Sequence, residues 1–168
     1  MREVDQALRA EVGASARLDA KMVERIAVVD KINTARLKRI LLDCGWPGQS
    51  RYGEQASHDA WLIAQHADHD PAFQRHAVRL LSQAVEAREA PPKQLAYLSD
   101  RVDVAAGRPQ QYGTQFQSKD GCSLELLPID NRDAVNGRRK AIGLTSLEEY
   151  ERLAHERFRP SGCPALSQ

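Results

Sequence analysis

Aromatic side chains are scarce in this chain of 168 residues, where Phe, Trp and Tyr together make up 5% of the sequence. A core with few aromatic rings has to be built from Leu, Ile, Val and Ala, and such a composition favours helices over strands. The chain length suits one domain. The composition therefore predicts a mainly α-helical protein.

Cysteine is also rare, and Cys44, Cys122 and Cys163 stand far apart. The sequence has no Cys-x-x-Cys pair, which excludes a zinc knuckle and a dithiol redox motif of the usual spacing. No apolar run approaches the length of a membrane span, and the first residues lack the apolar region of a secretion signal. We therefore expect a cytoplasmic protein with reduced thiols and no membrane partner.

Neither sign of charge dominates, since 24 basic residues face 23 acidic residues and the net charge is +1. Nucleic-acid-binding proteins usually concentrate basic residues on one face, because phosphate contacts supply much of their affinity. The basic run at residues 138–140 is too short to form such a face. We therefore expect no nucleic-acid partner. The common motifs of phosphate loops, dinucleotide-binding folds, nucleophile elbows and zinc proteases are absent as well.

Apolar residues at spacings of three and four predict a bundle of five to seven helices. The longest stripe runs from Leu18 to Cys44, and Gly45 suits the left-handed position after a helix. Asp70 before Pro71 is typical of an N-cap followed by proline at the first helical position. Thr145 and Glu148 have the spacing of a capping box. The expected helices cover residues 1–14, 15–44, 54–67, 71–90, 92–105, 131–142 and 145–158.

The period changes between residues 112 and 127, where apolar and polar residues alternate on both sides of Lys119-Asp120-Gly121. This alternation predicts one β-hairpin. A two-residue loop would pair Phe116 with Glu125, whereas a three-residue loop with Gly121 in the left-handed position pairs Phe116 with Leu124. We favour the three-residue loop because it keeps one face apolar. The prediction is a single domain over residues 1–158, followed by a flexible tail over 159–168.

The densest polar segment, residues 65–74, lies at the expected corner between two helices. Histidine exchanges protons near neutral pH and an aspartate can orient its ring, so His66 or His69 is predicted to act as the acid or base, oriented by Asp68. Gln65 and Gln74 are predicted to contact the substrate. The alternative is a structural corner, in which histidines at a helix end are favoured by the helix dipole alone.

A divalent metal held by His66 and His69 is the least favoured use of this segment, because spacing marks no third ligand. We therefore expect no cofactor.

Two later segments carry further polar side chains. Arg101 has the chemistry to grip a carboxylate or phosphate with two hydrogen bonds, although Asp100 and Arg101 could equally pair with neighbouring helices. Tyr112 and Gln115 belong to the predicted hairpin, where the Gln115 face meets either solvent or a cleft. In the functional model these four residues join the His66 corner in one cleft and position an anionic or amide-bearing substrate.

Four segments together resemble a known family: 45–47 (Gly-Trp-Pro), 65–74 (Gln-His-Ala-Asp-His-Asp-Pro-Ala-Phe-Gln), 96–102 (Ala-Tyr-Leu-Ser-Asp-Arg-Val) and 112–116 (Tyr-Gly-Thr-Gln-Phe). The chain resembles a family of uncharacterised bacterial proteins that is known only as a domain of unknown function, roughly from Asp30 to Tyr150. The resemblance implies a bacterial source and marks these segments as signatures. It implies no mechanism.

The sequence leaves two functions open. The first is an enzyme for a small molecule or peptide, in which a histidine drives a hydrolytic or group-transfer step. The alternative is a non-catalytic protein-binding or regulatory module, whose polar residues tie its helices together.

Overall fold

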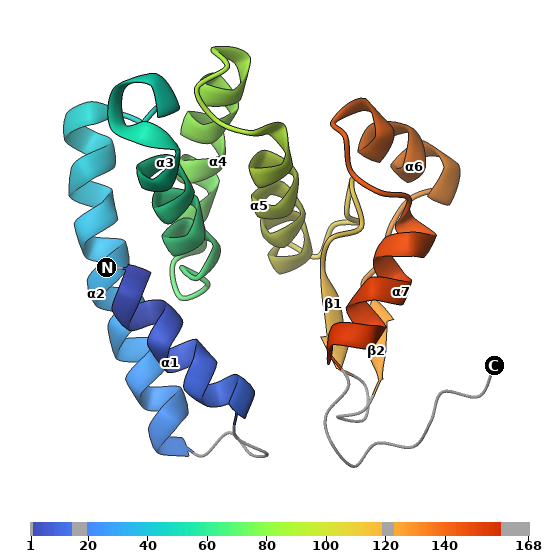
Figure 1. Ribbon diagram of the computed structural model, residues 1–168, viewed down its shortest axis with the longest axis horizontal. Coiled ribbons are helices and arrows are strands. Elements are labelled where there is room, and N and C mark those ends of the chain that lie inside the picture. The colour runs from blue at the N-terminus through green and yellow to red at the C-terminus, as the bar shows by residue number, and fades with distance from the viewer. Residues whose placement is uncertain (1, 15–19, 119–122, 159–168) are drawn as a thin grey trace. The chain divides into compact units, whose positions relative to one another are not determined.

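The computed structural model describes residues 2–14, 20–118 and 123–158. In these ranges, seven helices and one two-stranded antiparallel sheet confirm the expected mainly α-helical protein with a hairpin (Figure 1). The chain divides into two compact units, Met1–Leu98 and Ser99–Gln168. The single domain over residues 1–158 stays a prediction, and the expected tail lies outside the described residues. None of the described helices has the length and apolar composition needed to cross a membrane.

The first unit is built from four complete helices and the first half of a fifth. These are α1 (Arg2–Ala14), α2 (Ala20–Cys44), α3 (Gln49–Gln65), α4 (Pro71–Glu86) and α5 (Pro92–Ala105). Helix α2 packs against α1 and α3, and α4 packs against α3 (Figure 1). The core contains Leu37, Ile63 and Leu81 together with buried alanines such as Ala64 and Ala77. Small side chains on α3 and α4 let the two helices approach closely.

Two helix ends in this unit confirm the local sequence signals. Gly45 follows α2 with a φ of 67°, and its backbone nitrogen donates to the carbonyl of Leu41 over 3.0 Å. The turn after it is fixed to α3, because the Trp46 indole nitrogen donates to the Ser57 hydroxyl over 3.1 Å. Asp70 caps α4 as expected, since its carboxylate accepts from the backbone nitrogen of Phe73.

Helix α4 ends at Glu86, and the expected extension to residue 90 is wrong. Arg88 adopts a left-handed conformation with a φ of 61°, which glycine usually supplies. The backbone nitrogens of Arg88 and Glu89 donate to Val85 and Ala84, the two bonds of a Schellman motif. The carboxylate of Glu89 then accepts from Ser50, so the end of α4 is tied to the start of α3. Helix α3 itself begins earlier than expected, with a kink at Gly53.

The second unit holds the end of α5, a hairpin of β1 (Phe116–Ser118) and β2 (Leu124–Leu126), and the helices α6 (Arg132–Ala141) and α7 (Leu147–Phe158). Phe116 pairs with Leu126 and Ser118 with Leu124, so the expected pairing of Phe116 with Leu124 is wrong by two residues. The apolar residues still share one face, as the sequence predicted. The expected left-handed Gly121 lies outside the described residues.

The buried side chain of Gln110 explains this register. Its amide nitrogen donates to the carbonyls of Gln115 and Leu127, over 3.1 and 2.8 Å, and its oxygen accepts from the backbone nitrogen of Gln115 over 2.6 Å. The nitrogen of Leu127 also donates to the carbonyl of Gln115. Residues 115 and 127 are thereby held opposite each other, and this pairing carries the strands into the observed register.

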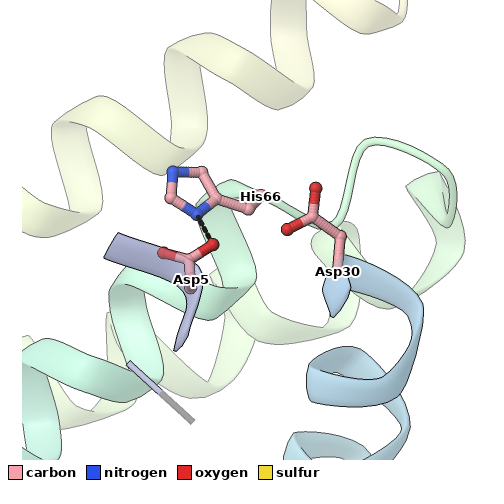
Figure 2. Close-up of side chains that lie close together, drawn as sticks. All are labelled: Asp5, Asp30 and His66. Carbon is pink, nitrogen blue, oxygen red and sulfur yellow. Dashed lines mark hydrogen bonds and ion pairs between the residues drawn. The ribbon is translucent and has the colours of Figure 1, made fainter. Parts of the chain in front are cut away.

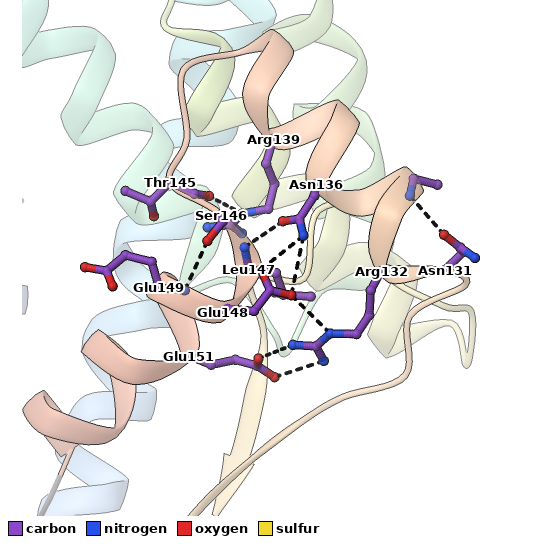
Figure 3. A network of polar contacts seen from close by, with 11 residues as sticks. Asn131, Arg132, Asn136, Arg139, Thr145, Ser146, Leu147, Glu148, Glu149 and Glu151 are labelled. Atoms are coloured by element: carbon purple, nitrogen blue, oxygen red, sulfur yellow. Dashed lines mark hydrogen bonds and ion pairs between the residues drawn. The ribbon is translucent and has the colours of Figure 1, made fainter.

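Side-chain caps fix the two C-terminal helices (Figure 3). Asn131 caps α6, as one of the two candidates predicted, by accepting from the backbone nitrogen of Ala134. Ser146 caps α7 in place of the expected Thr145, because the hydroxyl of Ser146 accepts from the backbone nitrogen of Glu149 over 3.2 Å. The side-chain oxygen of Asn136, on α6, accepts from the nitrogen of Leu147 and joins the two helices.

Candidate functional site

A histidine and an aspartate from distant parts of the chain meet in the first unit (Figure 2). His66 Nδ1 lies 3.1 Å from Asp5 Oδ1. Asp5 stands on α1 and is 3% exposed, whereas His66 follows the last residue of α3 and its side chain is 18% exposed. The pair therefore combines a buried carboxylate with an imidazole that solvent can still reach.

Arg9 joins this pair to a second carboxylate. Its Nε donates to Asp5 Oδ1 over 3.0 Å, and its Nη2 donates to Asp30 Oδ1 over 2.8 Å. Asp5 and Arg9 are four residues apart on α1, which places them on the same helix face. Asp30 comes from α2, so three helices converge on this group. We call Asp5, Arg9, Asp30 and His66 the acidic centre.

The corner that carries His66 is held by Gln74, which is 1% exposed. The amide nitrogen of Gln74 donates to the carbonyls of Ala64 and Gln65, over 3.1 and 3.4 Å, and to Asp68 Oδ1 over 3.1 Å. These carbonyls belong to the last turn of α3, where a helix leaves acceptors without helical partners. Gln74 thus fixes the end of α3 and with it the position of His66.

Burial and neighbouring charge shift the titration of the acidic centre. Burial, and then the Arg9 guanidinium, lower the pKa of His66 below its usual value, although Asp5 and Asp30 act in the opposite direction. Burial raises the pKa of Asp5, but hydrogen bonds from Gln6 and Arg9 and the charge of His66 outweigh it and leave that pKa lowered. Burial raises the pKa of Asp30. Asp5 is therefore ionised near pH 7, where His66 is neutral.

The ionised state of Asp5 assigns the proton on His66. A carboxylate only accepts hydrogen bonds, so Nδ1 of a neutral His66 carries the hydrogen and Nε2 keeps a lone pair. Asp5, Asp30 and His66 also have the composition of a metal site, since one ligand atom of each lies within 4.8 Å of the others. The arrangement can therefore hold an oriented base or a cation.

The other predicted residues of this corner lie outside the acidic centre. Asp68 accepts from Gln74, and the aspartate that orients the His66 ring in the structure is Asp5. His69 is exposed. Gln65 is 6% exposed, and its Oε1 has no hydrogen-bond partner among the described residues. The catalytic parts of His69 and Asp68 and the substrate contacts of Gln65 and Gln74 stay predictions.

In the second unit, Asp100 is completely buried and holds the segment before β1. Its carboxylate accepts from the backbone nitrogens of Gln111, Tyr112 and Thr114, over 2.8 to 3.0 Å, and from the Thr114 hydroxyl. Burial raises the pKa of Asp100, against the effect of these hydrogen bonds. The four contacts leave Asp100 as an internal acceptor of this unit.

Arg101 and Gln115 lie next to this carboxylate and are half-buried. Arg101 Nη1 donates to Gln115 Oε1 over 3.2 Å, and Gln115 Nε2 donates to the Thr114 hydroxyl. Tyr112 is half-buried, and its carbonyl accepts from Nη1 of Arg139 over 2.7 Å. Pairing of Asp100 with neighbouring helices was one alternative predicted above; in the structure Asp100 bonds to the loop before β1. The shared cleft with the His66 corner stays a prediction.

Several residues of these networks were not predicted from the sequence. Asp5, Arg9 and Asp30 look like ordinary charged positions on amphipathic helices, and only the four-residue spacing of Asp5 and Arg9 is a local signal. Arg139 is 1% exposed, and the basic run at 138–140, judged above too short for a nucleic-acid-binding face, gave no sign of this burial. Its Nε donates to the carbonyl of Thr145, and its guanidinium lies over the Tyr150 ring at 4.7 Å.

Comparison with known proteins identifies a family, but the function of that family is unknown. No curated protein and no solved structure matches the chain. A family model described as "Family of unknown function (DUF6624)" matches residues 1–159, which include both the acidic centre and the Asp100 network. The match extends beyond the Asp30–Tyr150 range of the resemblance noted above. The chain belongs to this family of unknown function.

Proposed function

We propose that the protein is a small-substrate enzyme in which His66 acts as general base and acid in a hydrolytic or group-transfer step. The observation that carries the proposal is the 3.1 Å contact between His66 Nδ1 and the buried carboxylate of Asp5. Such a carboxylate fixes the ring and its tautomer, and stabilises the imidazolium that forms when the ring accepts a proton.

The proton path follows from the tautomer. Nε2 of His66 takes the proton from an attacking water or substrate hydroxyl, and then returns it to the leaving group. Asp5 keeps accepting from Nδ1 throughout and does not itself need to be protonated. Because the pKa of His66 is lowered, the imidazole is neutral near pH 7 and ready to accept a proton.

Charge balance narrows the substrate class. Two carboxylates, Asp5 and Asp30, face the single guanidinium of Arg9, so the acidic centre carries excess negative charge while His66 is neutral. The two carboxylates would repel an anionic substrate group that is close enough to hydrogen-bond to His66 Nε2. A neutral group such as an amide or ester suits the centre better, in line with the amide-bearing alternative of the sequence analysis.

The test compares wild-type protein with His66→Gln in a small-molecule extract, with reactants and products followed by mass spectrometry. Wild type is expected to convert a substrate with the mass change of hydrolysis or group transfer, and His66→Gln to slow that reaction by about a hundredfold or more. His76→Gln is the matched control, because His76 is exposed on α4. Equal turnover by wild type and His66→Gln would contradict the proposal.

A binding or regulatory module is the second candidate. The second unit supports it, because the side chains of Asp100, Gln110 and Arg139 form hydrogen bonds to other residues of that unit. Such contacts build a scaffold and need no substrate. A folded wild-type protein that converts nothing in the extract would favour the module over the enzyme.

A further inference from the structure

Asp5 from α1, Asp30 from α2 and His66 just after α3 bring together three side chains of the kinds that bind metal ions (Figure 2). Ligand atoms of Asp5, Asp30 and His66 all lie within 4.8 Å of one another. Two ligands bound to one ion at about 2.0 to 2.1 Å stand roughly 2.8 to 3.4 Å apart at octahedral or tetrahedral angles. The 3.1 Å between His66 Nδ1 and Asp5 Oδ1 falls in that range.

We propose that Asp5, Asp30 and His66 form a binding site for one divalent transition-metal ion, which enters in exchange for the Arg9 guanidinium. Arg9 bridges the two carboxylates and so occupies the place of a cation between them. Its side chain is 32% exposed, so the guanidinium can swing into solvent without unfolding α1. A divalent ion neutralises both carboxylates, whereas Arg9 neutralises one.

Two residues close in sequence to the ligands of the acidic centre carry buried polar atoms without partners among the described residues. Gln65 precedes His66 in the chain, and its Oε1 lacks a donor although the residue is 6% exposed. Asn33 follows Asp30 by one turn of α2, is 5% exposed and has no acceptor for its Nδ2. Asn33 also lines a pocket with Val4, the residue before Asp5. Buried polar groups rarely stay unpaired, and a hydrated ion offers water molecules that can both donate and accept hydrogen bonds.

The ligand set indicates the kind of ion. Imidazole nitrogen favours zinc, iron and related ions, and carboxylate oxygen also suits manganese. Three protein ligands leave at least one coordination position for water. An ion on Nδ1 would leave the ring hydrogen on Nε2, so a metal-bound His66 could not accept a proton. If His66 is the general base of the proposed enzyme, the bound ion therefore inhibits it. This consequence, unlike the binding itself, rests on the proposed function.

The position of the ion can be tested without any substitution. Mn²⁺ is added to the ¹⁵N-labelled full chain, and the paramagnetic broadening of backbone amide signals is recorded. We expect the signals of Gln6, Lys31 and Ala67 to broaden first, because these residues are next to the three ligands. Broadening centred on the exposed residues His69 and His76 would overturn the proposal, and so would an absence of broadening.

Matched variants test the ligands and the exchange, with Zn²⁺ binding measured by calorimetry on metal-free protein. Asp30→Asn should weaken binding by about tenfold or more, while Asp43→Asn, at an exposed position on the same helix, should leave it unchanged. Arg9→Gln should tighten binding, since it removes the competing cation. Equal affinity of wild type and Asp30→Asn, or weaker binding by a folded Arg9→Gln protein, would overturn the proposal.

The readouts separate this inference from the proposed enzyme. Ion binding is measured with no substrate present, so its failure leaves the turnover test of His66→Gln untouched. Conversely, a protein without turnover can still bind one ion at Asp5, Asp30 and His66. If both hold, Zn²⁺ is expected to lower turnover of the wild type more than that of Asp30→Asn.

Discussion

The Asp5 carboxylate and the His66 imidazole, 61 positions apart in the chain, form a 3.1 Å contact at the junction of three helices. Arg9 and Gln6 donate to the same carboxylate, so its orientation is fixed by the first turns of α1. Gln74 holds the last turn of α3, and so fixes the backbone from which the His66 side chain extends. A functional histidine needs this kind of support, because its ring must keep one nitrogen free and pointed at the substrate.

Substitution of Asp5 by Asn tests this support. An asparagine can keep the position of the side chain but carries no charge to stabilise an imidazolium, so turnover should fall by about a hundredfold or more. The ¹⁵N shifts of the His66 ring should also change, since the hydrogen on Nδ1 loses its ionised acceptor. Turnover and imidazole NMR are measured on the same sample. Unchanged ring shifts in folded Asp5→Asn protein would show that Asp5 does not set the tautomer.

Stability of the first unit should depend on pH through His66. Its pKa is about 6.5 in an unfolded chain and is lowered in the folded protein, mainly by burial. Between the two values the unfolded chain binds more protons, so stability rises with pH across this window and is lost as pH falls through it.

Urea unfolding on both sides of this window checks the pH effect. The signal is tryptophan fluorescence, because both tryptophans, Trp46 and Trp61, belong to the first unit. His66→Gln should flatten the dependence, whereas His76→Gln, at an exposed position, should keep it. A wild-type protein that is equally stable across the window would contradict the lowered pKa of His66.

Local rules predicted those parts of the fold that depend on neighbouring residues. Gly45 and Asp70 end and begin helices as their types require, because a left-handed turn and an N-cap are decided within a few positions. The end of α4 was missed because Arg88 takes the left-handed position without a glycine to mark it. The hairpin register was missed because it depends on Gln110, which the strand pattern does not include.

The candidate site also contains one residue that the sequence predicted and several that it did not. His66 was found because the polar residues around it are dense in the sequence itself. Its partners Asp5, Arg9 and Asp30 were missed, because helix packing brings them to His66 from separate helices and no spacing in the chain records that packing. Asp68 was chosen as the orienting residue only because it is a close neighbour in sequence.

The hairpin register can be tested at Gln110. Gln110→Leu removes the acceptor for the Gln115 nitrogen and the donor to the Leu127 carbonyl, both part-buried. A loss of about 2 kcal/mol is expected, with faster hydrogen exchange at the Leu127 amide. Gln111→Leu is the control, because Gln111 is exposed and its side chain, among the residues that the structure describes, makes one weak contact, 3.4 Å to Asp103. Equal exchange at Leu127 in both variants would show that Gln110 does not hold the strands.

Asp100 offers the strongest test of the second unit as a scaffold. Asp100→Asn keeps the shape of the side chain but replaces one carboxylate oxygen with a nitrogen that cannot accept from the backbone. Because the site is completely buried, nitrogens of Gln111, Tyr112 or Thr114 would be left without an acceptor. The free energy of unfolding of this unit should fall by about 2 to 4 kcal/mol.

Thermal unfolding and hydrogen exchange at the Thr114 amide measure the effect of Asp100→Asn. The control is Asp103→Asn, one turn away on α5, whose ion pair with the 56% exposed Arg108 should contribute less than about 1 kcal/mol. If Asp100→Asn lost turnover in the extract while the melting temperature and the Thr114 exchange rate stayed at wild-type values, Asp100 would act on a substrate. Loss of stability with turnover retained per folded molecule would assign it to the scaffold.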